Sequence, residues 1–268
     1  MHCKFCFATY DSISAQDTRS GLSLKQSMSL IELLGAAGFQ KITFAGGEPT
    51  LCPWLSDLIA FSADTGLRTG LVTNGSRLRS RRHSGLLRNL DWLVISVDSL
   101  SPDVNRRHGR AVAGLRAVDP KIVISAADHR GKHVRLKINT VVTQLNANEI
   151  LLPFIQRVRP QRWKIMQVLT IRGENDVGYG HLSVSPAEFR RFIDRNSPPP
   201  IGTTLVTEDN DDMTGSYVMI DPAGRFISNI TGAYEVSRPI LEVGVTSAMT
   251  DISYDSERFR QRGGFYDW

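Results

Sequence analysis

Cysteine is scarce in this sequence, and long apolar runs are missing. Three cysteines in 268 residues are too few for the disulfide framework of a small secreted domain. No apolar stretch approaches the roughly 20 residues that span a bilayer, and the first residues contain no apolar segment typical of a secretory signal. We therefore expect a cytoplasmic protein that has no membrane partner.

A strong charge of either sign is also lacking. The chain carries 32 Lys and Arg against 27 Asp and Glu, a net charge of +5, which suits an anionic small molecule about as well as nucleic acid. One basic group is interpreted as a solvated helix face: Arg77, Arg79, Arg81, Arg82 and Arg88. The acidic run 208–212 lacks the glycine-punctuated spacing of a calcium loop, so we expect it to be exposed. No nucleic-acid partner is expected.

Helix-like and strand-like segments alternate through the first part of the chain. Residues 24–37 fit a helix that stops at Gly38, Pro53 suits the first turn of a second helix, and further helices are expected up to Leu90 and over 148–158. Strands are expected at residues 41–44, 71–73, 92–97, 134–142 and 163–169. Repeated βα units predict an α/β fold whose parallel sheet curls into a partial (β/α) barrel, with the chemistry at the carboxyl ends of the strands.

The regular alternation ends in the second half of the chain. Residues 221–224 (Asp-Pro-Ala-Gly) predict a tight turn between strands at 217–220 and 225–227. We expect one compact domain, made of a barrel core over 1–170 and an irregular C-terminal extension over 171–268 that completes the barrel.

Two short motifs contain residue types that bind cofactors. Cys3 and Cys6 form a C-x-x-C pair followed by Phe7, which alone is compatible with a redox dithiol, half of a zinc site or two incidental cysteines. Gly46-Gly47-Glu48-Pro49 follows an expected strand, where two glycines allow a ligand to approach the backbone closely. By itself this second motif is also typical of an ordinary tight turn.

Together the two motifs resemble the radical S-adenosylmethionine (SAM) superfamily. There, three cysteines in the pattern C-x3-C-x2-C hold a [4Fe–4S] cluster, whose fourth iron binds the methionine part of SAM. Cys3 and Cys6 match the second and third cysteines, and Phe7 matches the aromatic residue after them. The first cysteine would lie two residues before Met1, so we expect the chain to start within the motif and to lack the first barrel strand. Cys52 is considered as a substitute ligand, although a lone cysteine at a helix start is more often a small buried hydrophobe.

Five further blocks narrow the resemblance. They are Lys137-Ile138-Asn139, Arg162-Trp163-Lys164, Gly173-Glu174-Asn175, Ser216-Tyr217 and Arg262-Gly263-Gly264. In this order they are similar to viperin and its prokaryotic relatives, which convert a nucleoside triphosphate to its 3′-deoxy-3′,4′-didehydro form. The resemblance implies dehydration of CTP, or of GTP or UTP, to a chain terminator used in antiviral defence. It also implies a [4Fe–4S] cluster and SAM as cofactors, and a flavodoxin or ferredoxin as electron donor.

The resemblance also assigns a role to each matching residue. The methionine amine of SAM would be held by Gly46, Gly47 and Glu48, with Asn74 beside them, and its carboxylate by Ser96 and Arg110. The triphosphate would be clamped by Lys137, Asn139, Arg162 and Lys164, and covered by Arg262, Gly263 and Gly264. Tyr217 would deliver hydrogen to the radical that forms on the substrate after the 4′ hydrogen is taken.

Residue spacing supports part of this assignment independently. Arg162 and Lys164 alternate along an expected strand and so share one face, which points inward in a barrel. Lys137 and Asn139 repeat this two-residue period on the previous strand. Because inward-facing cations without partners are costly, an anionic ligand explains these residues better than packing does.

The sequence departs from the family at two positions. Phe265 stands where animal viperins have a lysine, and a further phosphate-binding residue has only an approximate counterpart near Arg238. Two other functions stay open: a radical SAM enzyme with a different substrate, and a nucleotide-binding protein without a cluster. The first predicts that Lys164→Ala changes little, whereas the second predicts triphosphate binding through the same basic residues without iron.

Overall fold

The computed structural model describes residues 1–10, 21–78, 85–176 and 180–265. Its centre is a six-stranded sheet with the order β1-β2-β3-β6-β7-β8, in which every neighbouring pair is parallel. The strands are β1 (Lys41–Phe44), β2 (Arg68–Thr73), β3 (Trp92–Ser96), β6 (Arg135–Val142), β7 (Arg162–Gln167) and β8 (Thr204–Glu208). The predicted parallel sheet is therefore confirmed, and β8 is a strand that the sequence pattern did not predict.

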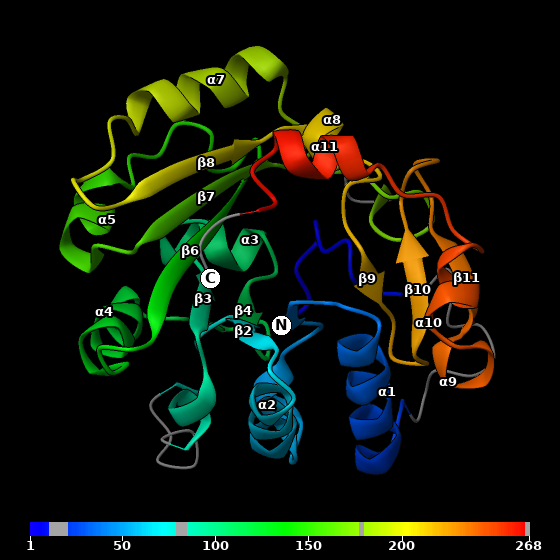
Figure 1. Ribbon diagram of the computed structural model, residues 1–268. Coiled ribbons are helices and arrows are strands. Elements are labelled where there is room, and N and C mark those ends of the chain that lie inside the picture. Colours follow the sequence, from blue (N-terminus) through cyan, green and yellow to red (C-terminus); the bar gives the residue numbers. More distant parts are fainter. Residues whose placement is uncertain (11–20, 79–84, 177–179, 266–268) are drawn as a thin grey trace.

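Helices follow the outside of the curved sheet (Figure 1). They are α1 (Leu24–Ala36), α2 (Leu55–Asp64), α4 (Pro120–His129), α5 (Leu152–Val158) and α7 (Pro186–Arg195). Fully buried apolar side chains of the central strands join the main core: Leu71, Leu93, Leu136, Ile138, Trp163 and Ile165. Because side chains alternate along a strand, the residues between them, such as Lys137 and Lys164, face the inside of the curve.

Local sequence signals fix where these helices begin. The Ser23 side chain accepts a hydrogen bond from the Gln26 amide while the Gln26 side chain accepts one from the Ser23 amide. Ser185 and Glu188 make the same reciprocal pair at the start of α7. Such capping boxes satisfy amides that the first helical turn leaves without partners. Because α1 spans Leu24–Ala36, the predicted helix at 24–37 is confirmed.

The sheet is an open barrel with β1 and β8 at its two edges. No strand among the described residues pairs across the gap between these edges, and residues 1–10 contain no strand. The expected partial (β/α) barrel is therefore confirmed. The division into 1–170 and 171–268 stays a prediction. No described helix has the length and apolar character needed to cross a bilayer.

A second, smaller sheet lies beside α1 (Figure 1, orange). It joins β9 (Met219–Ile220), β10 (Arg225–Ser228) and β11 (Glu235–Pro239) in antiparallel pairs, which confirms the predicted hairpin. Two short helices follow, α9 (Ile240–Val243) and α10 (Val245–Met249). Phe226, Ile240 and Ala248 pack with Leu30 and Leu34 of α1 in a separate core, so the C-terminal part of the chain is tied to the first helix.

Some predicted elements differ from the structure. Pro53 does not open a helix: a 3₁₀ turn, η1 (Pro49–Leu51), comes first, and α2 begins at Leu55. Where the arginine-rich helix was expected, the described residues contain a 3₁₀ turn, η3 (Leu86–Asn89), while Arg79, Arg81 and Arg82 lie outside the described residues. Short elements went unpredicted: α3 (Pro102–Arg107), β4 (Ala111–Val112), β5 (Arg116–Ala117), α8 (Asn210–Met213) and α11 (Ser256–Gln261).

Candidate active site

The segment with the two cysteines is docked against the loop that follows α3. The His2 amide donates to the Gly109 carbonyl (3.2 Å) and the Lys4 amide to the His108 carbonyl (2.9 Å). Phe5 is buried, with its ring edge-to-face against His108 at 5.2 Å between centroids. These contacts fix the backbone that presents both thiols.

Glycine is required where this segment meets the loop. Gly109 has a φ of +76°, and a Cβ built there would lie 2.0 Å from the His2 carbonyl oxygen. Both the backbone conformation and the space therefore exclude a larger residue. Gly109 was not singled out from the sequence, because an isolated glycine gives no sign of what it contacts.

The two thiols lie beside a charged pair. The Cys6 amide donates to the Cys3 carbonyl (3.0 Å), which closes a turn between them. Arg110 forms a buried ion pair with Asp98, and its guanidinium carbon lies 5.9 Å from the centre of the Phe5 ring. Burial raises the pKa of the Cys3 thiol, and Arg110 opposes that rise. Arg110, which was predicted to bind the SAM carboxylate, is thus held close to the cysteines by Asp98.

The predicted SAM residues lie at the carboxyl ends of neighbouring strands. Glu48 follows β1, and its carboxylate accepts hydrogen bonds from the Thr73 hydroxyl (2.7 Å) and the Asn74 amide (2.9 Å). Gly46 has a φ of +119°, and the space where its Cβ would stand is open. Ser96 ends β3 in register with Asn139 of β6. The structure therefore gathers these residues at the carboxyl ends of β1, β2 and β3, as their predicted role requires.

The cysteines fit a [4Fe–4S] cluster as two of its three thiolate ligands. Cys3 and Cys6 are partly exposed cysteines that form no disulfide and lie on a fixed turn. Among the described residues, however, no group of three His, Cys, Asp or Glu side chains comes together as a metal site. Cys52 packs against the main apolar core, as Cys3 also does, so its role as a substitute ligand stays a prediction. The position of the first family cysteine precedes residue 1.

Basic side chains from several strands converge inside the curve. Lys137 and Asn139 of β6 lie in register with Arg162 and Lys164 of β7, so the predicted two-residue alternation is seen. Lys41 of β1 adds a further cation, whose pKa is lowered by burial and then by Lys164, Arg262 and Arg162. The sequence analysis missed Lys41, which precedes the Gly-Gly motif on the same strand. These side chains form the basic cluster: Lys41, Lys137, Arg162, Lys164 and Arg262.

Burial and mutual repulsion disfavour the charges of the basic cluster. They lower the pKa of Lys41 to about 7 and hold the pKa of Lys137 well below its usual value. Burial also lowers the pKa of Lys164 to about 8, although Glu208 opposes this shift. Lys137 has no hydrogen-bonded or ion-paired partner among the described residues. An anion placed between these groups would relieve the repulsion.

One carboxylate enters the basic cluster. Glu208 ends β8 with 1% exposure and lies 2.5 Å from the Lys164 ammonium and 3.0 Å from the Arg262 guanidinium. The Tyr217 hydroxyl donates to Glu208 and accepts from Lys164. The prediction that the whole run 208–212 is exposed is therefore wrong for Glu208, because β8 carries this residue into the interior before the chain turns outward in α8.

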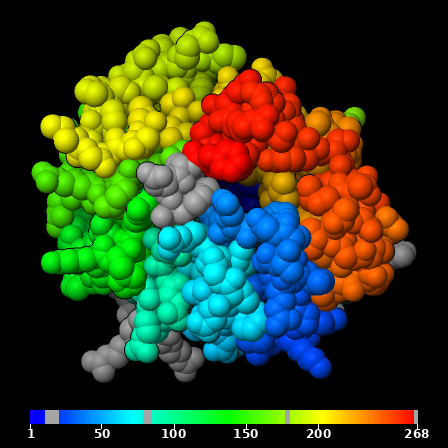
Figure 2. Space-filling view, viewed as in Figure 1, coloured from blue at the N-terminus to red at the C-terminus, as the bar shows by residue number. Residues whose placement is uncertain are grey.

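The C-terminal segment covers the basic cluster. Arg262 donates to the Ser216 carbonyl (2.9 Å) and lies 3.9 Å above the Tyr217 ring, while Arg162 donates to the Gly263 carbonyl (3.1 Å). Figure 2 shows this segment in red at the rim of a hollow in which the dark-blue N-terminal residues are visible. Arg238, in contrast, pairs with Asp251 at the surface, so the structure does not join it to the basic cluster.

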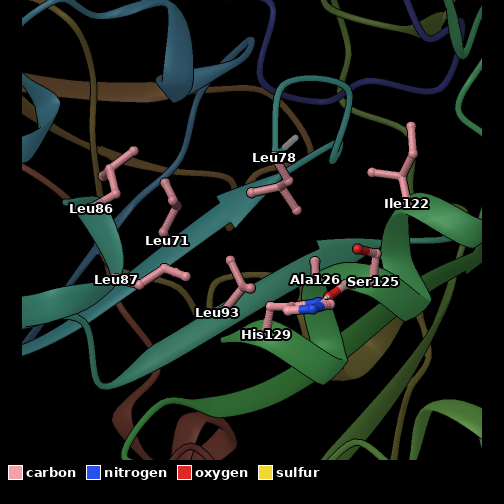
Figure 3. A pocket seen from close by; sticks show the side chains of 9 residues that line it. All are labelled: Leu71, Leu78, Leu86, Leu87, Leu93, Ile122, Ser125, Ala126 and His129. Carbon is pink, nitrogen blue, oxygen red and sulfur yellow. Dashed lines mark hydrogen bonds between the residues drawn. The ribbon is translucent and has the colours of Figure 1, made fainter. Parts of the chain in front are cut away.

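An apolar pocket lies elsewhere in the fold, between the sheet, η3 and α4 (Figure 3). Its lining is mostly leucine, with Ser125 and His129 as polar members, and His129 Nδ1 lies 2.7 Å from the Ser125 carbonyl oxygen. No arginine or lysine lines it among the described residues. This pocket is therefore unsuited to a polyanion, and the hollow beside the basic cluster is the candidate active site.

Comparison with known proteins agrees with this geometry. The family model described as the Radical SAM superfamily matches residues 1–142. The chain belongs to the radical SAM superfamily. Enzymes of this superfamily use a [4Fe–4S] cluster and SAM.

Relatives match over the whole chain. A Flammeovirga pacifica protein named S-adenosylmethionine-dependent nucleotide dehydratase is 42% identical over 275 residues, covering 100% of this chain and 92% of that protein. A Lacinutrix mariniflava protein of the same name is 40% identical, and this chain spans 56% of its length. Within the superfamily, the chain therefore belongs to this family of nucleotide dehydratases.

Solved structures agree on the fold. Streptococcus suis SuiB bound to the precursor peptide SuiA has a TM-score of 0.62 at 16% identity, over 98% of this chain and 64% of that one. A structure titled native anSMEcpe with bound AdoMet and a peptide has a TM-score of 0.59 at 16% identity, over 85% of this chain and 70% of that one. At such identities the likeness concerns the fold alone.

Proposed function

We propose that this chain is a radical SAM enzyme that dehydrates a nucleoside triphosphate. The observation that carries the proposal is the basic cluster, in which five basic side chains from β1, β6, β7 and the C-terminal segment meet inside the barrel. Buried cations that repel one another are stabilised by a polyanion. The names of the relatives supply the reaction class.

The edge of the sheet at β1, β2 and β3 would hold SAM. Glu48 would accept the methionine amine, and Arg110, oriented by Asp98, would bind the carboxylate through its guanidinium. When bound, the cluster and SAM supply the radical that removes a hydrogen from the ribose. The protein holds both partners in place and excludes water from them.

The basic cluster would hold the triphosphate, with Asn139 beside it and the segment Arg262-Gly263-Gly264 above it. This would leave the ribose near Tyr217, whose hydroxyl is the proposed source of the returning hydrogen. We propose CTP, or GTP or UTP, as substrate and the 3′-deoxy-3′,4′-didehydro nucleotide as the chain-terminating product. A small electron-transfer protein such as a flavodoxin or ferredoxin would supply the electron.

Nucleotide binding by the purified chain tests the substrate class directly. Isothermal titration with CTP, GTP and UTP should give binding that Lys164→Ala weakens about 10- to 100-fold, the expected cost of losing a charged hydrogen bond. The matched control is Lys25→Ala, which removes the same charge from the exposed surface of α1 and should change nothing. Equal affinity in the native chain and Lys164→Ala would contradict the proposal.

Cluster binding needs a separate experiment, because the chain provides two ligands of the motif. We would compare the chain preceded by Cys-Asn, which completes C-x3-C-x2-C, with the same chain preceded by Ser-Asn. Anaerobic reconstitution should give a full iron complement and 5′-deoxyadenosine release with the first chain only. Iron uptake and SAM cleavage without triphosphate binding would instead indicate another substrate, and triphosphate binding without iron in either chain would indicate a nucleotide-binding protein.

A further inference from the structure

Glu208 is a buried carboxylate inside a site that we assign to a polyanion. It lies 2.5 Å from Lys164 and 3.0 Å from Arg262, and the Tyr217 hydroxyl donates to it. Its exposure is 1%. Neither the motifs nor the family resemblance assigned it a role, so its presence in this position needs a physical explanation.

Neither affinity nor stability explains a carboxylate at this place. A negative charge near the phosphates repels them, which weakens triphosphate binding. Burying an ion pair also brings little stability, since well-packed apolar residues of similar volume often stabilise as much or more. Lys164 and Arg262 have further contacts of their own, with the Tyr217 hydroxyl and the Ser216 carbonyl respectively.

The geometry points to Tyr217 as the side chain that Glu208 holds in position. Tyr217 lies in the connection between α8 and β9, outside any strand, so the sheet alone does not fix its side chain. Three contacts do: the ring lies 3.9 Å below the Arg262 guanidinium, the hydroxyl donates to Glu208, and the same hydroxyl accepts from Lys164. Glu208 contacts Tyr217 and also pairs with Lys164 and Arg262, the two other residues that hold the tyrosine.

We propose that Glu208 is a positioning residue, which holds the Tyr217 hydroxyl at the nucleotide and is retained at a cost in triphosphate affinity. The inference rests on the proposed function, in which Tyr217 delivers hydrogen. It makes two predictions of opposite sign. Removing the charge of Glu208 should strengthen nucleotide binding and, at the same time, impair the step that needs the tyrosine.

The test uses Glu208→Gln, with Asp211→Asn as the matched control. Asp211 is exposed and belongs to the same acidic run, so its change removes one charge without reaching Tyr217. In Glu208→Gln the triphosphate dissociation constant should fall about three- to tenfold, as expected for removing a unit charge a few ångströms from the phosphates. In the reconstituted enzyme, the ratio of 5′-deoxyadenosine to dehydrated nucleotide should rise at least about tenfold, because substrate radicals go unquenched when the tyrosine is misplaced.

Measurements in the Tyr217→Phe variant separate a positioning role of Glu208 from a general structural role. In Tyr217→Phe, adding Glu208→Gln should leave the product ratio as it is in Tyr217→Phe alone, yet still tighten triphosphate binding. Glu208→Asp keeps the charge but withdraws the carboxylate from the hydroxyl. It should raise the product ratio while leaving the dissociation constant within about twofold, since the Coulomb interaction is nearly preserved.

The outcomes distinguish this inference from the proposed function. Weaker binding in Glu208→Gln with an unchanged product ratio would overturn the inference, because the carboxylate would then only organise the cations. If Glu208→Gln does not fold, Glu208→Asp decides: an unchanged product ratio overturns the inference, and a raised ratio supports it. A native chain that binds no triphosphate would overturn the proposed function itself, whatever the variants do.

Discussion

At the carboxyl ends of β1, β2 and β3, Glu48 and Arg110 each have dedicated partners, whereas the basic residues inside the curve crowd around the buried carboxylate of Glu208. Glu48 is surrounded by hydroxyl and amide donors, and Arg110 is paired with Asp98. In the basic cluster, by contrast, burial and then the neighbouring cations lower the pKa values of Lys41 and Lys137. The proposed SAM site at the ends of β1, β2 and β3, called the cofactor edge below, is therefore organised before any ligand binds. The cations of the basic cluster instead repel one another until an anionic ligand binds.

The Arg110–Asp98 pair should give the largest effect at the cofactor edge. Asp98→Asn leaves a buried guanidinium without its counterion, which should lower the free energy of unfolding by about 3–5 kcal/mol. Asp128→Asn removes the partner of Arg157 in an exposed pair and should cost at most about 1 kcal/mol. Urea unfolding of both variants checks this. Equal costs would mean that the cofactor edge is not organised by its buried pair.

The docking of the cysteine segment can be broken at a single glycine. Gly109→Ala should free residues 1–7, because the new Cβ would collide with the His2 carbonyl at a positive φ. Labelling of Cys3 and Cys6 by a thiol reagent should become at least about tenfold faster, as local opening replaces protection. Gly114→Ala is the matched control: its φ is +72°, but nothing lies within 4 Å of the added Cβ. Similar labelling rates in the two variants would contradict the docking.

The lowered pKa of Lys41 predicts opposite pH trends for the free energy of unfolding and for triphosphate affinity. Folding lowers the pKa of Lys41 to about 7, against about 10.4 in an unfolded chain. Above pH 7 the unfolded chain therefore holds a proton that the folded chain has released, so stability rises as pH increases from about 7 towards 10. Triphosphate affinity should fall over the same range, because binding needs the protonated lysine.

Thermal melts and nucleotide titrations at pH 7 and 9 measure both trends. In Lys41→Met, the changes of stability and of triphosphate affinity between pH 7 and 9 should both be smaller. Lys164, whose pKa is lowered to about 8, would account for the pH dependence that remains. Lys25→Met, on the exposed face of α1, should behave as the native chain does. Affinity that rises with pH in the native chain would show that Lys41 is not part of the phosphate site.

Cys52 should give the smallest effect. A lone cysteine that packs against the main core is expected to act as a small hydrophobe, so Cys52→Ser should leave iron binding of the Cys-Asn-extended chain unchanged and cost about 1 kcal/mol or less in stability. Iron analysis after anaerobic reconstitution measures this. Loss of about a quarter or more of the iron would make Cys52 a ligand.

Spacing along the chain was sufficient to predict five of the six strands of the sheet and much of the basic cluster. The apolar runs of β3, β6 and β7 mark strands that are buried on the helix side, and the two-residue period places Lys137, Arg162 and Lys164 on the opposite side.

The residues that the sequence analysis missed depend on contacts between distant segments. Lys41 meets Lys164 only because the sheet curves, and Gly109 matters only because His2 lies against it. Glu208 was misjudged since its acidic neighbours in sequence are exposed. The strand that turns it inward had not been predicted, because Thr204–Glu208 shows no clear two-residue alternation of buried and exposed positions.

The central claim is that the barrel interior takes a polyanion, and a phosphate series tests it most directly. Affinities of cytidine, CMP, CDP and CTP for the native chain would be measured by calorimetry at low and high salt. The account predicts that affinity increases with each phosphate, by about tenfold or more overall, and that salt weakens CTP binding most. Equal affinity for cytidine and CTP at both salt concentrations would contradict it, because the basic cluster would then play no part in binding.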